Sequence, residues 1–147
     1  MPSSHISLNV HLVFSTKDRL PLISADYLER LHAYLGGIVK GMEAMPLAIG
    51  GVSDHVHLLV SLKSKHRLDY FLRDLKADSS TWFHKELHQK FEWQKGYGAF
   101  SVSPTAIDSV KKYIVNQAIH HQKKSFQEEY RELLKASGIE FNEEYLW

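Results

Sequence analysis

The sequence predicts an α+β fold in which an antiparallel sheet is covered by helices. The length of the chain and the order of its elements predict it. The chain has 147 residues, the size of one domain, and such a chain can bury about two thirds of the surface it exposes when unfolded. Strand-like and helix-like segments follow one another in the order β-α-β-β-α-β, and two more helices come after them. We therefore expect a single domain, 1–147, whose helical C-terminal part spans 104–147.

The first two elements are a strand and a helix. Residues 5–16 alternate apolar and polar side chains, which is typical of a half-buried strand. Apolar residues then recur at helical spacing over 28–42. Ser24 precedes this segment as a possible N-cap, and Gly41 marks its end.

A hairpin and a long helix follow. The apolar runs 47–52 and 55–62 are separated only by Ser53 and Asp54, a pair suited to a tight turn. Helical periodicity over 68–87 predicts a second helix. We expect it to bend near 78–80, where helix propensity is weak.

The C-terminal third is expected to hold one strand and two helices. The aromatic, glycine-punctuated segment 91–103 reads as a strand with a turn or bulge. Pro104 opens a helix that should run to about residue 121. Ser125 and Glu128 have capping-box spacing, and the helix that they begin should end near Gly138.

This order of elements is that of a ferredoxin-like or RRM-like fold, a split β-α-β unit with an antiparallel sheet. We expect its helices on one face of the sheet, with a C-terminal helical extension appended. A fold of this kind does not by itself indicate a function.

Composition excludes several classes of function. The chain has no cysteine, so it has no disulfide, no Cys-ligated zinc and no thiol nucleophile. Its formal net charge of +1 is too small to indicate nucleic-acid binding by bulk electrostatics. The start of the sequence lacks the pattern of a signal peptide, and no run approaches about 18 apolar residues. We expect a cytoplasmic protein without membrane contact.

Two histidines in "SDHVHLLVSL" are the first candidate for chemistry. His55 and His57 are two residues apart in a predicted strand, so their side chains point to one face while Val56 and Leu58 point to the other. Two imidazoles held together form half of a metal site. Taken alone, such a pair more often has a structural role, so further ligands are needed.

The segment "YIVNQAIHH" supplies further candidates on one edge of a predicted helix. Tyr113, Gln117 and His120 fall within about 60° of one another, and His121 lies close by. Together with the strand pair they offer a nucleophile and metal ligands. The neighbouring apolar stripe, expected to dock on the sheet, comprises Ile107, Val110, Ile114 and Ala118.

These residue types suit phosphodiester chemistry. A divalent ion held by two imidazoles and one amide or carboxylate oxygen keeps open positions for substrate oxygens. A tyrosine hydroxyl, with a pKa near about 10, is a poor nucleophile unless a positive charge lies nearby. The metal ion, Lys111 and Lys112 are candidates for that charge.

An ordered set of blocks resembles a known family. The stretches are "HLVFSTKDRLPLI", "SDHVHLLVSL", "WQKGYGAFSVS", "YIVNQAIHH" and "GIEFNEEYLW". In this order they are similar to the single-tyrosine HUH transposases of the insertion-sequence-200 (IS200/IS605) type, and they cover most of the chain. HUH stands for His-hydrophobic-His. The segment "NQAIHH" resembles the branch of that family carried by mobile elements.

The resemblance implies roles for individual residues. His55 and His57 would bind the metal, Tyr113 would be the nucleophile, and Gln117 would be the third ligand, with His121 as its rival. The implied reaction is metal-dependent cleavage of single-stranded DNA beside a hairpin, through a 5′-phosphotyrosine intermediate, followed by strand transfer. It would move an insertion sequence. The cofactor would be Mg²⁺ or Mn²⁺, and two imidazoles lean toward Mn²⁺.

The resemblance also implies partners. Single-stranded DNA with hairpin ends would be the substrate, and the protein would work as a homodimer. In that dimer Tyr113 either serves its own chain's histidines or completes the site of the partner in trans. Candidate DNA contacts are Lys63, Lys65, Arg67, Lys111, Lys112 and Tyr97.

Two other readings stay open at this point. The stretch "KGYGAFSV", residues 95–102, overlaps the RNP1 pattern of RNA-binding modules, although Phe100 sits one place late. That class would bind single strands without cleaving them. A His-ligated zinc hydrolase would use the histidine pair with His120 or His121 and would not need Tyr113.

Overall fold

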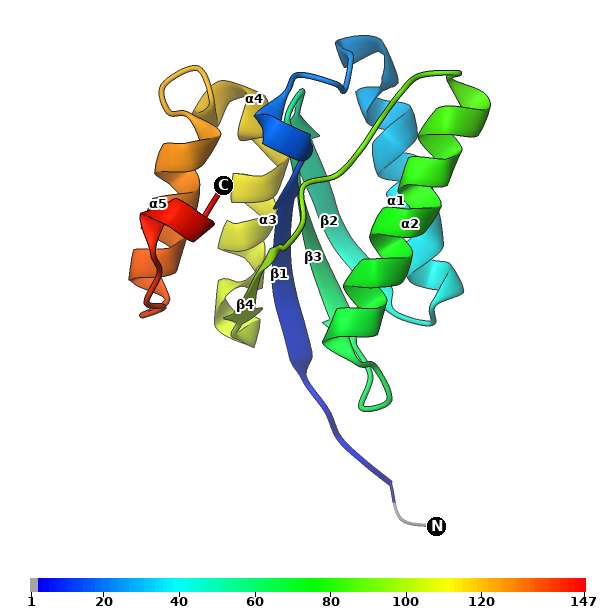
Figure 1. Ribbon diagram of the computed structural model, residues 1–147. Helices are drawn as coiled ribbons and strands as arrows, with labels where there is room; N and C mark the ends of the chain where they lie inside the picture. The colour runs from blue at the N-terminus through cyan, green and yellow to red at the C-terminus, as the bar shows by residue number, and fades with distance from the viewer. Residues whose placement is uncertain (1–2) are drawn as a thin grey trace.

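The sheet is antiparallel and four-stranded, as the sequence predicts. A computed structural model describes residues 3–147, and the strands lie in the order β2-β3-β1-β4 (Figure 1). Every neighbouring pair is antiparallel. The bounds are β1 (Leu8–Ser15), β2 (Met45–Val52), β3 (His55–Leu62) and β4 (Gly98–Val102).

Helices cover both faces of this sheet. Figure 1 shows α1 (Leu28–Gly41) and α2 (Leu68–Glu86) on one side. On the other side lie α3 (Ile107–Val115), α4 (Gln117–His120) and α5 (Phe126–Ala136). The α+β class is therefore confirmed, and the C-terminal helices form a second layer on the sheet. Short 3-10 turns lie at Lys17–Arg19, Ala25–Tyr27, Pro104–Ala106 and Glu143–Tyr145.

The main apolar core lies between the sheet and the helices α1 and α2. Alternate residues of β1 and β3 point into it, and each is fully or almost fully buried. The core includes Leu12, Phe14, Val56, Leu58 and Val60 from the strands, and Leu31, Leu35, Val39, Phe71, Leu72, Leu75 and Phe83 from the helices.

A glycine sets the approach of α3 to the opposite face. Gly50 in β2 is the cross-strand partner of His57. A Cβ atom at this position would overlap the backbone carbonyl oxygen of Ile114. Glycine is therefore required if the α3 backbone is to lie directly on the strand. This contact brings the helix that carries Tyr113 beside the histidine pair.

The structure corrects two expectations in the N-terminal half. The first strand begins at Leu8 rather than residue 5, and Leu8 is 46% exposed. The second helix does not bend near 78–80, because Ser79 is buried and fully bonded there. Its hydroxyl donates to the carbonyl of Leu75 at 2.7 Å and accepts from Trp93 Nε1 at 2.9 Å.

The C-terminal third differs from expectation in two places. The segment 91–103 contains only the short strand β4, and Trp93 contributes a single bridge to Thr16. The helix expected to run from Pro104 to about residue 121 is interrupted at Asn116, whose φ and ψ are −98° and 21°. Because of this break Ala118 is exposed, contrary to its predicted place in the apolar stripe.

The last helix behaves as expected. The Ser125 hydroxyl accepts a hydrogen bond from the backbone N–H of Glu128 at 3.2 Å, which caps α5. Gly138, with φ of 69°, follows its end in the left-handed conformation that glycine adopts readily. Within residues 3–147, no helix has the length and apolar character needed to cross a membrane.

Candidate active site

The histidine pair is fully buried beneath the C-terminal helices. His55 and His57 point to the face opposite Val56 and Leu58, as predicted, and neither has exposed surface. The Nδ1 atom of each ring contacts a polar side chain: His55 Nδ1 lies 2.7 Å from Asp54 Oδ1, and His57 Nδ1 lies 2.8 Å from His11 Nε2. Both Nε2 atoms therefore face the helices. Metal-binding histidines are commonly fixed in this way.

The break at Asn116 turns Gln117 inward. Its side chain is buried, and Oε1 lies 3.1 Å from His55 Nε2. The amide nitrogen donates to the backbone carbonyl of Tyr113 at 3.2 Å, which fixes the orientation of the amide. The structure thus places Gln117 against His55 of the histidine pair.

Tyr113 lies in the same site as the histidines of its own chain. The centre of its ring is 5.6 Å from that of His57 and 6.1 Å from that of His11. Its hydroxyl donates a hydrogen bond to Glu129 Oε2. Tyr113 and the two histidines of the same chain thus meet at one carboxylate.

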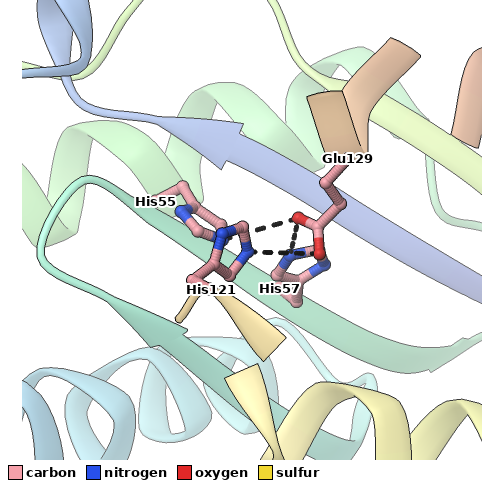
Figure 2. A group of neighbouring side chains, drawn as sticks. All are labelled: His55, His57, His121 and Glu129. Atoms are coloured by element: carbon pink, nitrogen blue, oxygen red, sulfur yellow. Dashed lines mark hydrogen bonds and ion pairs between the residues drawn. The ribbon is translucent and has the colours of Figure 1, made fainter. Parts of the chain in front are cut away.

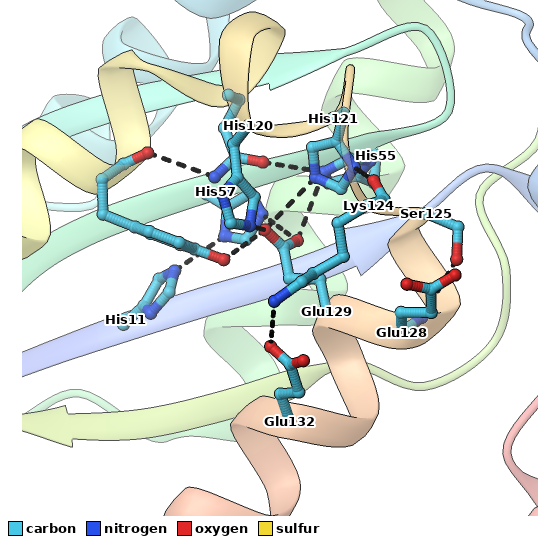
Figure 3. Close-up of polar contacts among 12 residues, drawn as sticks. His11, His55, His57, His120, His121, Lys124, Ser125, Glu128, Glu129 and Glu132 are labelled. Atoms are coloured by element: carbon cyan, nitrogen blue, oxygen red, sulfur yellow. Dashed lines mark hydrogen bonds and ion pairs between the residues drawn. The ribbon is translucent and has the colours of Figure 1, made fainter.

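Glu129 of α5, which the sequence analysis did not single out, is the centre of the site (Figure 3). It is 1% exposed. Its Oε1 lies 2.9 Å from His57 Nε2 and 3.6 Å from His55 Nε2. Its Oε2 lies 3.2 Å from the Nε2 atoms of both His120 and His121. One carboxylate therefore contacts four imidazoles and the tyrosine.

A signal for Glu129 exists in the sequence. Phe126, Tyr130 and Leu134 mark the inward face of α5, and Phe126 and Leu134 are buried. Glu129 follows Phe126 by three residues and so falls on that face. A carboxylate on the apolar side of an amphipathic helix needs buried partners, and histidines are the partners here.

Burial and mutual contacts shift the titration of the group. Burial lowers the pKa of His57 to about 4 and that of His11 to about 3. Burial, together with the hydrogen bond to Glu129, raises the pKa of Tyr113. Burial opposes ionisation of Glu129, but its contacts with His121 and His57 outweigh that effect and lower the pKa of the carboxyl. The phenol is thus protonated beside a charged carboxylate.

The group has the composition and spacing of a metal site. One donor atom from each of His55, His57, His121 and Glu129 lies within 4.8 Å of the others (Figure 2). His121 Nδ1 lies 2.7 Å from the carbonyl oxygen of Lys124, and its buried Nε2 has no hydrogen bond. Three imidazoles and a carboxylate suit divalent transition metals, so these side chains can hold a metal ion.

Three candidate DNA contacts lie away from this site. Lys63, Lys65 and Arg67 follow the far end of β3, about 20 Å along the strand from His57. Lys65 forms an ion pair with Glu43, and Arg67 Nη2 lies 2.9 Å from Asp69 Oδ2. The structure does not bring these residues to the histidine pair. Lys111 and Lys112, by contrast, are in α3 with Tyr113.

The aromatic residues divide into core and surface. Trp93 and Phe100 are each 7% exposed, and Phe100 packs with Val13 under α5. The sheet face that an RNA-binding module would present is therefore covered, and Phe100 is not available for base stacking. Tyr97 is 38% exposed and lines a cavity of about 190 Å³ together with Phe126.

Comparison with known proteins decides the family. A family model described as "Transposase IS200 like" matches residues 4–117. The chain belongs to the IS200-like transposase family. It is therefore a transposase, an enzyme of DNA transposition. The match includes His55, His57, Tyr113 and Gln117 and ends before His121 and Glu129.

Two solved structures share the fold of this transposase. A proposed transposase from Deinococcus radiodurans R1 is 24% identical, with a TM-score of 0.63, over 80% of this chain and 98% of that one. A REP-associated tyrosine transposase bound to a REP hairpin is 13% identical, with a TM-score of 0.61, over 82% of this chain and 73% of that one. A search of curated proteins finds no match.

Proposed function

We propose that this transposase cleaves and rejoins single-stranded DNA next to hairpins, with Tyr113 as the nucleophile. The observation that carries the proposal is the convergence of the Tyr113 hydroxyl with His55 and His57 in one buried site. All three residues lie in the segment that the family model matches. The fold relative that is described as bound to a REP hairpin supports a hairpin as the DNA partner.

In the proposed reaction the Tyr113 hydroxyl oxygen attacks the phosphorus of a scissile phosphodiester in line. A bond forms between the tyrosine oxygen and phosphorus, and the bond from phosphorus to the 3′-oxygen breaks. The products are a 5′-phosphotyrosine and a DNA strand with a free 3′-hydroxyl. Attack by a second 3′-hydroxyl on the phosphotyrosine reverses the step and joins new ends. One phosphodiester replaces another, so the reaction needs no ATP.

The protein groups around Tyr113 orient it and control its proton. Glu129 Oε2 accepts the hydrogen bond from the hydroxyl and so fixes the direction of the attacking oxygen. The raised pKa of Tyr113 keeps the phenol protonated until positive charge is present. Water is the acceptor of the proton that the phenol loses, and the departing 3′-oxygen takes up a proton in turn.

A divalent ion, Mg²⁺ or Mn²⁺, is the proposed cofactor. His55 and His57 would bind it through their inward Nε2 atoms, with Gln117 Oε1 or His121 Nε2 beside them. When bound, it supplies the positive charge that polarises the phosphate and stabilises the phenolate. His11 and Asp54 would keep the two strand imidazoles in position.

We also propose that the transposase acts as a homodimer, because strand transfer must hold two DNA ends. The edge strand β2 and the exposed apolar side chains of Val115 and Ile119, 63% and 62% exposed, offer a surface for a second copy. Light scattering after size-exclusion chromatography measures the mass in solution. A monomer at micromolar concentration, with and without hairpin DNA, would contradict the dimer.

The test of the proposed function uses the full chain, Mn²⁺ and an end-labelled single-stranded hairpin oligonucleotide. We expect a protein-DNA adduct that survives denaturation. Tyr113→Phe and His57→Ala should abolish it. Tyr70→Phe, at a tyrosine 45% exposed on α2, is the matched control and should leave the adduct unchanged.

Each other outcome identifies a different function. An adduct in Tyr113→Phe would mean that the nucleophile is wrongly assigned. Cleavage without any adduct would favour a metal hydrolase that uses His120 or His121. Tight binding of the oligonucleotide without cleavage would favour a binding module.

A further inference from the structure

Glu129 does not have the surroundings of an ordinary ion-pair partner. A carboxylate has two oxygens and about four lone-pair positions, yet five side chains converge on this one. Each of the two carboxylate oxygens also contacts a different set of side chains. Oε1 faces the strand residues His55 and His57, whereas Oε2 faces Tyr113 and the histidines that follow α3. The carboxylate thus lies between the metal-binding pair and the nucleophile.

In the neutral ring, His55 Nε2 has no hydrogen to donate to the two oxygen atoms that it faces. Its Nδ1 lies 2.7 Å from Asp54 Oδ1, so Nδ1–H donates to that carboxylate. In the neutral ring Nε2 then carries a lone pair. This nitrogen faces Gln117 Oε1 at 3.1 Å and Glu129 Oε1 at 3.6 Å. The Gln117 amide cannot simply be turned over, because its nitrogen donates to a backbone carbonyl. One lone pair therefore meets two oxygens, and a cation among them would satisfy all three.

His121 shows the same feature independently. Its Nδ1–H donates to the carbonyl of Lys124 at 2.7 Å, which leaves a lone pair on Nε2 in the neutral ring. That atom is buried, lies 3.2 Å from Glu129 Oε2 and makes no hydrogen bond. A buried polar atom without a partner is costly. Two imidazole lone pairs from different elements thus point at one carboxylate.

We infer that Glu129 is a direct ligand of the divalent ion in this transposase, with His55, His57 and His121 as the nitrogen ligands (Figure 2). The inference rests on the proposed function, which requires an ion at this place. It goes beyond the family match, because that match ends at Gln117 and α5 lies outside it. The same carboxylate accepts the hydrogen bond of Tyr113, so it joins the ion to the nucleophile.

With Glu129 as a ligand, the site should prefer different divalent metal ions. His55, His57 and Gln117 form a neutral set, whereas Glu129 adds a negative charge, and affinity for divalent cations rises with ligand charge. Three imidazoles with one carboxylate favour Mn²⁺ and Zn²⁺ over Mg²⁺. Four protein donors also complete the tetrahedral set that Zn²⁺ prefers. A metal that accepts six ligands keeps positions for phosphate oxygens.

The experiment measures metal binding without DNA. Mn²⁺ is titrated into the full chain and its free concentration is followed by electron paramagnetic resonance. We expect Glu129→Gln to weaken Mn²⁺ binding by at least about tenfold. The matched control is Glu128→Gln, the same charge change one residue earlier in α5, at a side chain outside the metal-binding group (Figure 3). It should leave the affinity unchanged.

Two further measurements keep the test decisive. Thermal unfolding in EDTA shows whether each variant folds. If Glu129→Gln folds poorly, Glu129→Asp replaces it, and the readout is the rise in Tm on adding Zn²⁺. That rise should be clearly smaller in Glu129→Asp than in wild type and in Glu128→Gln.

The outcomes separate this inference from the proposed function. If His57→Ala abolishes Mn²⁺ binding while Glu129→Gln binds as tightly as Glu128→Gln, the role of Glu129 is overturned and the proposed function stands. If the wild-type protein binds neither Mn²⁺ nor Zn²⁺, the metal-dependent function fails together with the inference.

Discussion

The two faces of the sheet are built from the same strands, but one buries apolar side chains and the other buries polar ones. On β1, Leu12 and Phe14 point toward α1 and α2, while His11 points toward α3 and α5. On β3, Val56 points one way and His57 the other. One face surrounds apolar side chains with other apolar side chains. The opposite face surrounds imidazoles with a carboxylate, an amide and a phenol. Burial gives cohesion on the first face and controls charge on the second.

The energetic consequences differ accordingly. A buried aliphatic side chain on the α1–α2 face contributes about 1.5–3 kcal/mol to stability. A buried polar group on the α3–α5 face costs free energy unless each of its atoms finds a partner. We therefore expect substitutions on the first face to act on stability and those on the second to act on chemistry. Five predictions test this division, and the four substitutions among them are taken from the largest expected effect on stability to the smallest.

Leu58→Ala should be the most destabilising of the substitutions. Leu58 is fully buried in the core beneath α1 and α2. Removing its side chain leaves a cavity and should lower the free energy of unfolding by about 3 kcal/mol. Urea denaturation measures this value. The adduct yield per folded molecule should not change, and a selective loss of adduct would contradict the division between the faces.

Gly50→Ala should affect both properties. The added Cβ overlaps the carbonyl oxygen of Ile114, so α3 must move away from β2. We expect a loss of about 1–3 kcal/mol in urea denaturation and a marked fall in adduct formation. Gly37→Ala is the control. A Cβ there meets no atom within 4 Å, and the change within α1 should stabilise by up to about 1 kcal/mol.

Stability of the metal-free protein should fall as pH is lowered from about 6.5 to about 4. The folded-state pKa values of His57 and His11, about 4 and about 3, lie below the ordinary value of 6.5. The unfolded chain therefore binds protons first, and each histidine should contribute up to about 1.4 kcal/mol per pH unit. Burial also lowers the pKa of His32, so this histidine acts in the same direction.

Two other groups act mainly at the two ends of that pH range. Glu129, with a lowered pKa, adds to the loss of stability only below its ordinary value of 4.5. For His121, burial lowers the pKa, but the Glu129 carboxylate raises it by more, so the net shift is upward. The stability that this histidine contributes is therefore lost as the pH rises above 6.5. Urea denaturation at several pH values in EDTA measures the slope. His11→Asn should reduce it, and an unchanged slope would show that His11 is not held neutral.

Tyr113→Phe should change stability by only about 1 kcal/mol. The substitution removes one hydrogen bond to Glu129, whose Oε2 still lies 3.2 Å from His120 and His121. Thermal and urea unfolding measure the difference. A loss above about 3 kcal/mol would mean that the tyrosine is mainly a structural residue.

Lys65→Ala should have the smallest effect on stability, below about 0.5 kcal/mol. Its ion pair with Glu43 joins two exposed side chains. If Lys65 contacts a DNA phosphate, as the sequence analysis expects, Lys65→Ala should lower the affinity for hairpin DNA and decrease the slope of its salt dependence by about one. Binding measured at several salt concentrations tests this. An unchanged slope would remove Lys65 from the DNA surface.

Most of the fold could be predicted from the sequence, because periodicity reports which side of an element is buried. The hairpin through Ser53 and Asp54 and the capped helix after Ser125 are both present. The expected bend near Ser79 is wrong, since weak local propensity is outweighed by the buried hydrogen bonds of its hydroxyl. The break at Asn116 gave no comparable local signal.

The site was predictable only where the sequence spacing is short. His55 and His57 share a strand face, and Tyr113 and Gln117 share a helix edge, so pattern alone groups each pair. Glu129 lies on a different helix, and its distance from His57 is set by how α5 packs on the sheet. Local periodicity can place Glu129 on the inward face of α5, but it does not show which residues that face meets.

The break at Asn116 also has a mechanical consequence. The helix that carries Tyr113 has nine residues, and Ile114 is its buried side chain. In the proposed reaction a DNA strand becomes attached to Tyr113, and tension along that strand would pull on this short helix. Ile114, whose backbone carbonyl lies against Gly50, would pass that load to β2 and so to the sheet. The close backbone contact at Gly50 would then also anchor the tethered strand.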